Sequence, residues 1–246
     1  MCATNPTFFA LFSDPCTQQS LQSLLAEEED PFICQLITSW LDCYDSGVSV
    51  CASYDDYTTY SFSTLSGKTI TGLKYVGSST PPANYPSISN YASTSKINAS
   101  SYSYNCHSYA WYLNGSPLSK TQLWFDYPTD FMKSPTCATR VTTPKVGDIV
   151  VYTRLYNGVT DEVLHSALIT SVSNGTGHNS IVVKSKWGMY PVYSHILSDC
   201  PYYFSGTSLG YSMSITYYRL SHSYVLSGQY YVCQHCGYKS GVPGTR

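Results

Sequence analysis

The spacing of apolar residues changes along the chain, from a helical period near the N-terminus to alternation in the second half. Over residues 18–44 apolar positions recur with a period near 3.6, most clearly over 32–41. The dipeptide Asp30-Pro31 is typical of a helix start, because Asp caps the first turn and Pro fits its first position. The pattern therefore predicts helices over 18–44.

The middle of the chain has weaker signals. Residues 48–103 are rich in Ser, Thr and Tyr, with only short β-like runs, and 80–89 contains three prolines. Such a segment is typical of a loop or a linker. We therefore expect an N-terminal region over 1–90, a main domain over 91–221 and a tail over 222–246.

The second half shows clearer elements. A helix is predicted over 105–113, and strands are predicted over 149–152, 164–172, 181–187 and 212–220. The Gly-rich turn at 173–177 predicts antiparallel pairing of the strands on either side of it. One helix followed by an antiparallel meander, after a mainly helical N-terminal region, predicts an α+β fold.

Composition narrows the classes of partner. Only 11% of the 246 residues are charged, with 13 basic and 15 acidic side chains. This balance argues against nucleic-acid binding, which needs a basic surface, and no apolar run reaches the roughly 20 residues of a membrane-spanning helix. A hydroxyl-rich, weakly charged surface favours an extracellular or cell-surface location, although no signal peptide is evident. The oligomeric state stays open.

Two residues have the placement that nucleophilic catalysis requires. Cys106 lies at the start of the predicted helix, where unpaired N–H groups favour the thiolate and can bind an oxyanion. His165 lies at the start of a predicted strand, from which an imidazole could exchange protons with the thiol and with the leaving group. The alternative is a buried, unreactive cysteine, as most of the 10 cysteines are expected to be.

Three segments resemble the CHAP domain, a family of cysteine- and histidine-dependent amidohydrolases and peptidases. Residues 104–111 (YNCHSYAW) are similar to its nucleophile motif, in which a polar residue precedes the Cys and an aromatic-Ala-aromatic run follows. Residues 147–152 (GDIVVY) are similar to its Gly-Asp strand, and 164–169 (LHSALI) are similar to its histidine strand. The resemblance covers residues 95–220.

The resemblance implies a papain-like fold in which the nucleophile helix packs on an antiparallel sheet. It implies hydrolysis of a peptide or amide bond, commonly in bacterial peptidoglycan, with Cys106 as nucleophile and His165 as general base and acid. No cofactor is required for such catalysis. The neighbouring His107 leaves the helix about 100° away, so we interpret it as a surface or capping residue.

The third catalytic position departs from the family pattern. The family offers an acceptor that orients the imidazole, whereas the matched residue here is Lys186 or Ser185, and an ammonium group cannot accept that bond. Ser185, or His195 from the next loop, is the candidate for this role. Trp187 is expected either to line the substrate cleft or to lie in the core.

The missing acceptor favours a second hypothesis. In it the chain is a catalytically inactive papain-like binding module of a bacterial surface or secreted protein.

The tail contains a possible metal site. Cys233 and Cys236 form a CxxC pair of the kind that binds zinc, and His222 is a third potential ligand. The fourth ligand would be His235 or a more distant cysteine. The alternatives are a disulfide between the CxxC cysteines or two free thiols. A structural zinc here would also allow a third hypothesis, a zinc-stapled interaction protein.

Overall fold

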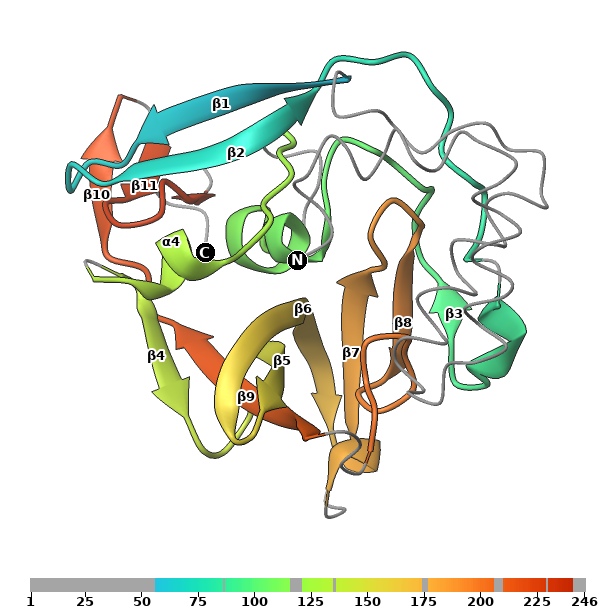
Figure 1. Cartoon of the computed structure of the whole chain (residues 1–246). Helices are drawn as coiled ribbons and strands as arrows, with labels where there is room; N and C mark the ends of the chain where they lie inside the picture. Colours follow the sequence, from blue (N-terminus) through green and yellow to red (C-terminus); the bar gives the residue numbers. More distant parts are fainter. Residues whose placement is uncertain are drawn as a thin grey trace.

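The computed structural model of the chain describes residues 56–240, except 86, 116–120, 135, 174–176, 206–209 and 229. Strands make up 43% of this part and helices 11%. Figure 1 shows a large sheet below a short central helix, with a β-hairpin on the opposite side of that helix.

The main sheet has seven strands, and every neighbouring pair is antiparallel. Across the sheet the order is β3 (Ser95–Lys96), β8 (Val192–Ile196), β7 (Ile181–Lys186), β6 (Val159–Val172), β5 (Ile149–Tyr156), β9 (Tyr211–Leu220) and β4 (Ala138–Val141). The four strands predicted for the second half correspond to β5, β6, β7 and β9, and the predicted antiparallel pairing of β6 with β7 is confirmed.

The sheet separates two buried clusters. On β5, Ile149 and Val151 belong to one apolar cluster, whereas Val150 and Tyr152 belong to the other. All four side chains are buried, because successive residues of a strand point to opposite faces and both faces are covered. We call the first cluster's side the helix face, because it also contains the aromatic residues of the central helix.

The central helix starts at Cys106 and includes the π-helical segment η3 (Ser108–Tyr112). All five residues of η3 are buried, and the backbone reverses after them through the positive-φ pair Asn114 and Gly115. The helix predicted over 105–113 is therefore present, in a short form.

Two smaller sheets lie outside the main one. They are the hairpin β1 (Tyr57–Ser63) with β2 (Thr69–Tyr75), and the sheet β10 (Tyr224–Ser227), β11 (Tyr230–Cys233) and β12 (Lys239–Ser240). The two meet where the amide of Ser66 donates to the carbonyl of Gln234 at 2.8 Å. The remaining elements are η2 (Ile88–Asn90), α4 (Thr129–Met132) and η4 (His178–Ser180).

The predicted α+β, papain-like fold is wrong. The described residues are mainly β, with only two short helices besides single 3₁₀ turns. The Ser/Thr/Tyr-rich segment that gave no clear signal forms the β1–β2 hairpin, the tail forms a sheet, and the nucleophile helix is only a few residues long. The helices predicted over 18–44 lie outside the described residues.

Within the part of the chain described, no helix has the length and apolarity needed to cross a membrane.

Candidate functional site

Cys106 lies at the first turn of the central helix and is 5% exposed. Burial raises the pKa of its thiol to about 11, while backbone hydrogen bonds from Ser166, His107 and Cys106 itself, together with nearby Lys186, act to lower it. The sulfur therefore lies where the amide groups of the helix start and of β6 converge. Such groups stabilise a thiolate and can equally stabilise an oxyanion.

His165 and Ser166 are consecutive residues of β6 and point to opposite faces of the sheet. The Ser166 hydroxyl accepts a hydrogen bond from Trp111 Nε1 at 3.0 Å and bonds His107 Nδ1 at 2.9 Å, so it faces the helix. The His165 ring stacks on Tyr202, with centroids 4.0 Å apart. Neither nitrogen of His165 has a hydrogen-bond partner among the described residues, so the predicted bond to Cys106 is not formed in this structure.

The His165 side chain is completely buried. Burial, and then the nearby His195 and His107, hold its pKa well below the usual range, so the imidazole is neutral at pH 7. The Tyr202 ring stacks on His165, and burial of the Tyr202 hydroxyl, with a smaller contribution from the nearby Cys106, raises the pKa of that hydroxyl.

The two residues predicted to orient His165 bond each other instead. His195 Nδ1 donates to the carbonyl of Ile196 at 2.8 Å, so in the neutral ring Nε2 accepts from the Ser185 hydroxyl at 2.8 Å. Trp187 Nε1 in turn donates to Ser185 at 3.1 Å. Trp187 is completely buried, so it lies in the core, which is the second of the two positions expected for it.

The position of His107 differs from the one expected from the sequence. It is 3% exposed, not a surface or capping residue, and burial lowers its pKa to about 3. The short helix packs directly on β6, so both the first and the second residue of the helix are covered.

Lys186 is a buried cation that the sequence analysis considered only as a failed acceptor. Its side chain is completely buried, and Nζ donates to the carbonyls of Gly188 at 2.8 Å and Tyr190 at 2.7 Å. Nζ also lies 4.9 Å from the centre of the Tyr104 ring. Lys186 pairs with Val192, which belongs to the cluster on the helix face, so Lys186 and Cys106 lie on the same side of the sheet.

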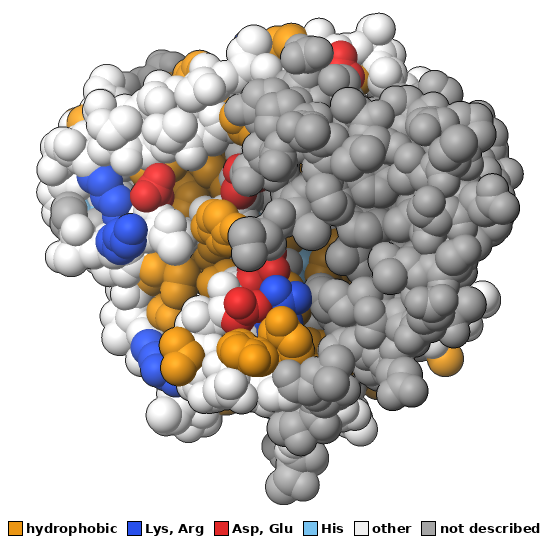
Figure 2. Space-filling model, viewed as in Figure 1, with side chains coloured by type: hydrophobic (Ala, Val, Ile, Leu, Met, Phe, Trp, Pro, Cys, Tyr) orange, Lys and Arg blue, Asp and Glu red, His pale blue; other side chains and the backbone are white. Residues whose placement is uncertain are grey.

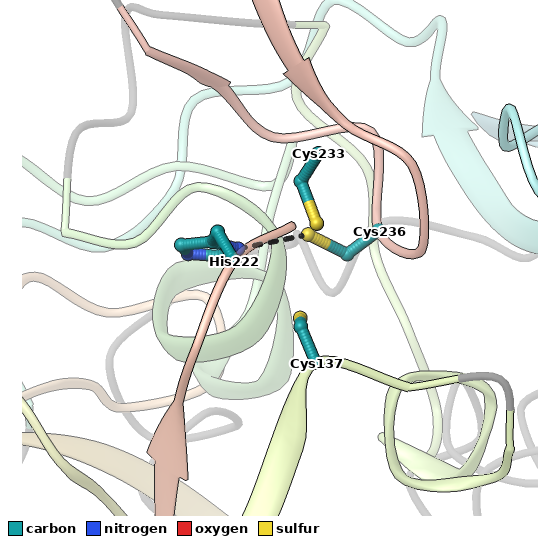
Figure 3. A group of neighbouring side chains, drawn as sticks. All are labelled: Cys137, His222, Cys233 and Cys236. Carbon is teal, nitrogen blue, oxygen red and sulfur yellow. Dashed lines mark hydrogen bonds between the residues drawn. The ribbon is translucent and has the colours of Figure 1, made fainter. Parts of the chain in front are cut away.

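A second group of side chains joins the main sheet to the tail. The ligand atoms of Cys137, His222, Cys233 and Cys236 all lie within 4.8 Å of one another. Figure 3 shows these four side chains pointing toward one another. Cys236 Sγ is 3.4 Å from His222 Nδ1. The three thiols are buried, and none forms a disulfide.

The topology explains why these four residues meet. Cys137 directly precedes β4 and His222 follows β9, and these strands are paired with Ala138 opposite Leu220. Both residues therefore leave the sheet at the same end. The CxxC pair lies at the end of β11 and in the turn after it, where Gly237 has the positive φ that this turn requires.

This donor set can hold a metal ion. Three cysteines and one histidine are a standard tetrahedral ligand set, and tetrahedral ligands about 2.3 Å from a metal are roughly 3.8 Å apart. The four ligand atoms, all within 4.8 Å of one another, are close enough for one ion to bind all of them. The fourth member is Cys137, the more distant cysteine, and not His235. No local spacing indicates Cys137, since only the pairing of β4 with β9 brings it to the tail.

Comparisons with protein-family models, with curated proteins and with solved structures find no match to this chain.

Proposed function

We propose that the chain is a cysteine-dependent hydrolase of peptide or amide bonds, with bacterial peptidoglycan as its substrate class. One observation carries this proposal: the Cys106 sulfur lies at a helix start, among backbone amides of the helix and of β6. Buried titratable groups with displaced pKa values, here Cys106, His165 and Lys186, are also typical of catalytic centres.

The reaction follows from the groups present. The Cys106 thiolate attacks the substrate carbonyl carbon and forms a C–S bond, while the backbone amides near the sulfur bind the developing oxyanion. His165 takes the proton of the thiol as the C–S bond forms, and the resulting imidazolium returns that proton to the leaving amine as the C–N bond breaks. Water then hydrolyses the thioester, which releases the acid and restores the thiol.

In the structure His165 stacks on Tyr202 on the face of β6 opposite to the helix, so this role requires the ring to move to the Cys106 side of β6. Neither ring nitrogen has a hydrogen bond to a described residue that such a movement would break.

The test is the release of new amino groups from purified peptidoglycan and from cross-linked stem peptides by the full chain. We expect Cys106→Ser and His165→Ala each to lower the rate at least about 100-fold. Cys200→Ser is the matched control, because Cys200 is a similarly buried thiol, 2% exposed, in the cluster on the other face of the sheet. Undiminished release by Cys106→Ser would overturn the proposal.

The second candidate is a catalytically inactive binding module of a surface or secreted protein. The burial of both Cys106 and His165, with no hydrogen bond between them, favours it. A module of this kind binds peptidoglycan without releasing amino groups. The Cys106→Ser variant of such a module binds peptidoglycan as strongly as the wild type. Sedimentation with insoluble cell walls, run beside the amino-group assay, separates the two candidates.

We also propose that Cys137, His222, Cys233 and Cys236 hold a zinc ion. Thiolate and imidazole ligands in a closed tetrahedral set are those of a structural zinc site. In this role zinc ties the β10–β11–β12 sheet to the end of the β4–β9 pair. It leaves no open position for substrate, so the ion supports the fold and takes no part in the proposed hydrolysis.

A further inference from the structure

The helix that begins at Cys106 is too short to be stable by itself. It spans residues 106–112, and the chain turns away after it through Asn114 and Gly115. Isolated helices shorter than about 12 residues are marginal in water. The position of Cys106 therefore depends on the residues that pack against this helix.

Tyr112, at the opposite end of the helix from Cys106, packs against two aromatic rings. Its ring centre lies 5.3 Å from that of Phe62 in β1 and 6.3 Å from that of Phe131 in α4. Tyr112 is 7% exposed and Phe131 is 4% exposed, so neither ring has free space around it. Since interiors are close-packed, a shift of either neighbour displaces the end of the helix.

Phe62 also contacts the turn that carries the CxxC pair. A Cβ atom at Gly237, the residue after Cys236, would lie 3.5 Å from Phe62 Cε2, which is van der Waals distance. The amide of Gly237 donates to the carbonyl of Cys233 at 2.9 Å and closes this turn. Figure 1 shows the tail sheet at the turn of the β1–β2 hairpin. Phe62 is therefore in contact with the metal-binding turn on one side and with the helix on the other.

Phe131 makes a similar connection from the fourth ligand. The hydroxyl of Thr136 donates to the carbonyl of Phe131 and accepts from the amide of Ala138 at 3.0 Å, and Cys137 lies between these two residues. Cys137, Cys233 and Cys236 share one buried cluster with the aromatic residues of the helix. Two separate segments of the chain thus join the ligand set to Tyr112.

These contacts give the metal an effect on Cys106 without any contact with substrate. An ion that binds one arrangement of its four ligands stabilises that arrangement and whatever is packed on it. We propose that Phe62 is a positioning residue for Cys106: it transmits the geometry of the metal-held CxxC turn to Tyr112, and so fixes the helix that Cys106 begins. This inference rests on the proposed zinc site and on the proposed function of Cys106.

The test is hydrogen exchange of the full chain, followed by mass spectrometry, with zinc bound and after removal of zinc by a chelator. The amides of 106–113 report the helix, and those of 149–152 in β5 report unfolding of the whole domain. In the wild type we expect zinc removal to speed exchange in the helix at least about 10-fold more than in β5, and added zinc chloride to reverse the change. Equal acceleration in both segments would mean that the metal only stabilises the whole fold, and would overturn the proposal.

The variant Phe62→Leu tests whether this ring carries the effect. We expect its helix to exchange faster than that of the wild type even with zinc bound, and zinc removal to add less than about 3-fold, because two changes that break the same connection are not additive. A ring with only a structural role would instead leave the full effect of zinc in place. A full effect of zinc in Phe62→Leu therefore overturns the role of this residue.

Tyr218→Leu is the matched control. Tyr218 is also partly buried against the same cluster, and its ring centre lies 5.3 Å from that of Trp111 in the helix, but it belongs to β9 of the main sheet and not to the hairpin that contacts the CxxC turn. Its substitution should weaken the helix by a similar amount with zinc bound and without it. If Phe62→Leu does not fold, the comparison of helix with β5 in the wild type still decides the proposal.

These measurements use no substrate, so their failure and the failure of the hydrolase proposal are distinguishable. A metal-dependent helix with no release of amino groups would retain the connection and remove the enzyme. Hydrolysis that depends on Cys106 but continues at the same rate after zinc removal, in a protein whose helix exchange is also unchanged, would do the reverse.

Discussion

Cys137 is the residue on which completion of the metal site depends. It is buried, it comes from a different sheet than the CxxC pair, and its sulfur lies within 4.8 Å of the other three ligand atoms. We expect the purified wild type to contain about one zinc per chain and Cys137→Ser to contain much less, because a hydroxyl is a far poorer zinc ligand than a thiolate. Elemental analysis after dialysis measures this directly.

Cys200→Ser serves as the control for zinc content. Cys200 is also a buried free thiol, but it lies in the cluster on the other face of the sheet, so its removal should leave about one zinc per chain. A wild type without bound zinc, or full occupancy in Cys137→Ser, would contradict the assignment.

Some residues of the candidate sites can be identified from the sequence and others cannot. Cys233 and Cys236 are recognisable because both ligands lie in one turn, and His222 is close enough in sequence to be considered with them. Cys137 and Lys186 are not recognisable in this way. The first depends on the pairing of β4 with β9, and the second on which face of β7 meets the helix.

At the scale of elements, β2 lies close to the segment around Trp124 and Phe125, and Gly72 makes this approach possible. Leu73 pairs with Trp124 through two backbone hydrogen bonds, of 2.8 and 2.7 Å. A Cβ atom at Gly72 would lie 2.7 Å from Phe125 Cε1 and 3.0 Å from the carbonyl oxygen of Trp124. Since the Phe125 ring is buried, at 2% exposure, it has little room to move.

We therefore expect Gly72→Ala to lower the free energy of unfolding by about 1–3 kcal/mol, as overpacking of a core typically does. Urea unfolding followed by circular dichroism measures the change. Thr59→Ala, at an exposed position of β1 opposite Leu73, should change stability by less than about 0.5 kcal/mol. Equal stability of Gly72→Ala and the wild type would show that β2 and the Trp124 segment are not packed closely.

The predictability of the strands follows from their side chains. The strands β5, β6 and β7 were predictable because Val and Ile give them a clear apolar pattern, and β9 was predictable because Met213 and Ile215 alternate with Ser and Thr. The β1–β2 hairpin and the tail sheet are built largely from Tyr, Thr and Ser, residues that suit both exposed and half-buried positions. Their strands therefore show little contrast between the two faces, and the fold class was misjudged for that reason.

The alternation of side chains along a strand also limits which residues of β6 can face the helix. In β6 the two residues after Leu164 must point to opposite faces, so Ser166 and His165 cannot both face the helix. The family resemblance identified the segment, but it did not establish which of the two residues faces Cys106.

At the scale of the whole molecule, the weakly charged surface contrasts with a core that contains several titratable groups. In the view of Figure 2 the charged side chains of the described residues are few and scattered among apolar and neutral ones. By contrast His107, His165, His195 and Lys186 are all buried, at 3% exposure or less. The pH dependence of stability should therefore come mainly from these buried groups.

Acid is expected to destabilise the protein through the buried histidines. Burial lowers the pKa of His195 to about 4 and that of His107 to about 3, whereas in the unfolded chain histidine has a pKa near 6.5. Between these values the unfolded chain binds more protons than the folded one, so the free energy of unfolding falls as pH falls from about 6.5 to 4. For His195 alone the loss across this range is about 3 kcal/mol.

Urea unfolding at a series of pH values from 7 to 4 tests this expectation, and substitution isolates the contribution of His195. His195→Gln should show a smaller loss of stability on acidification than the wild type, by up to about 1.4 kcal/mol per pH unit. His178→Gln, at a partly exposed position outside the core, should show the wild-type slope. Because any acid-induced loss of metal affects all three proteins equally, only the difference between slopes reports the buried imidazole. Identical slopes in His195→Gln and the wild type would mean that His195 is accessible to protons in the folded state.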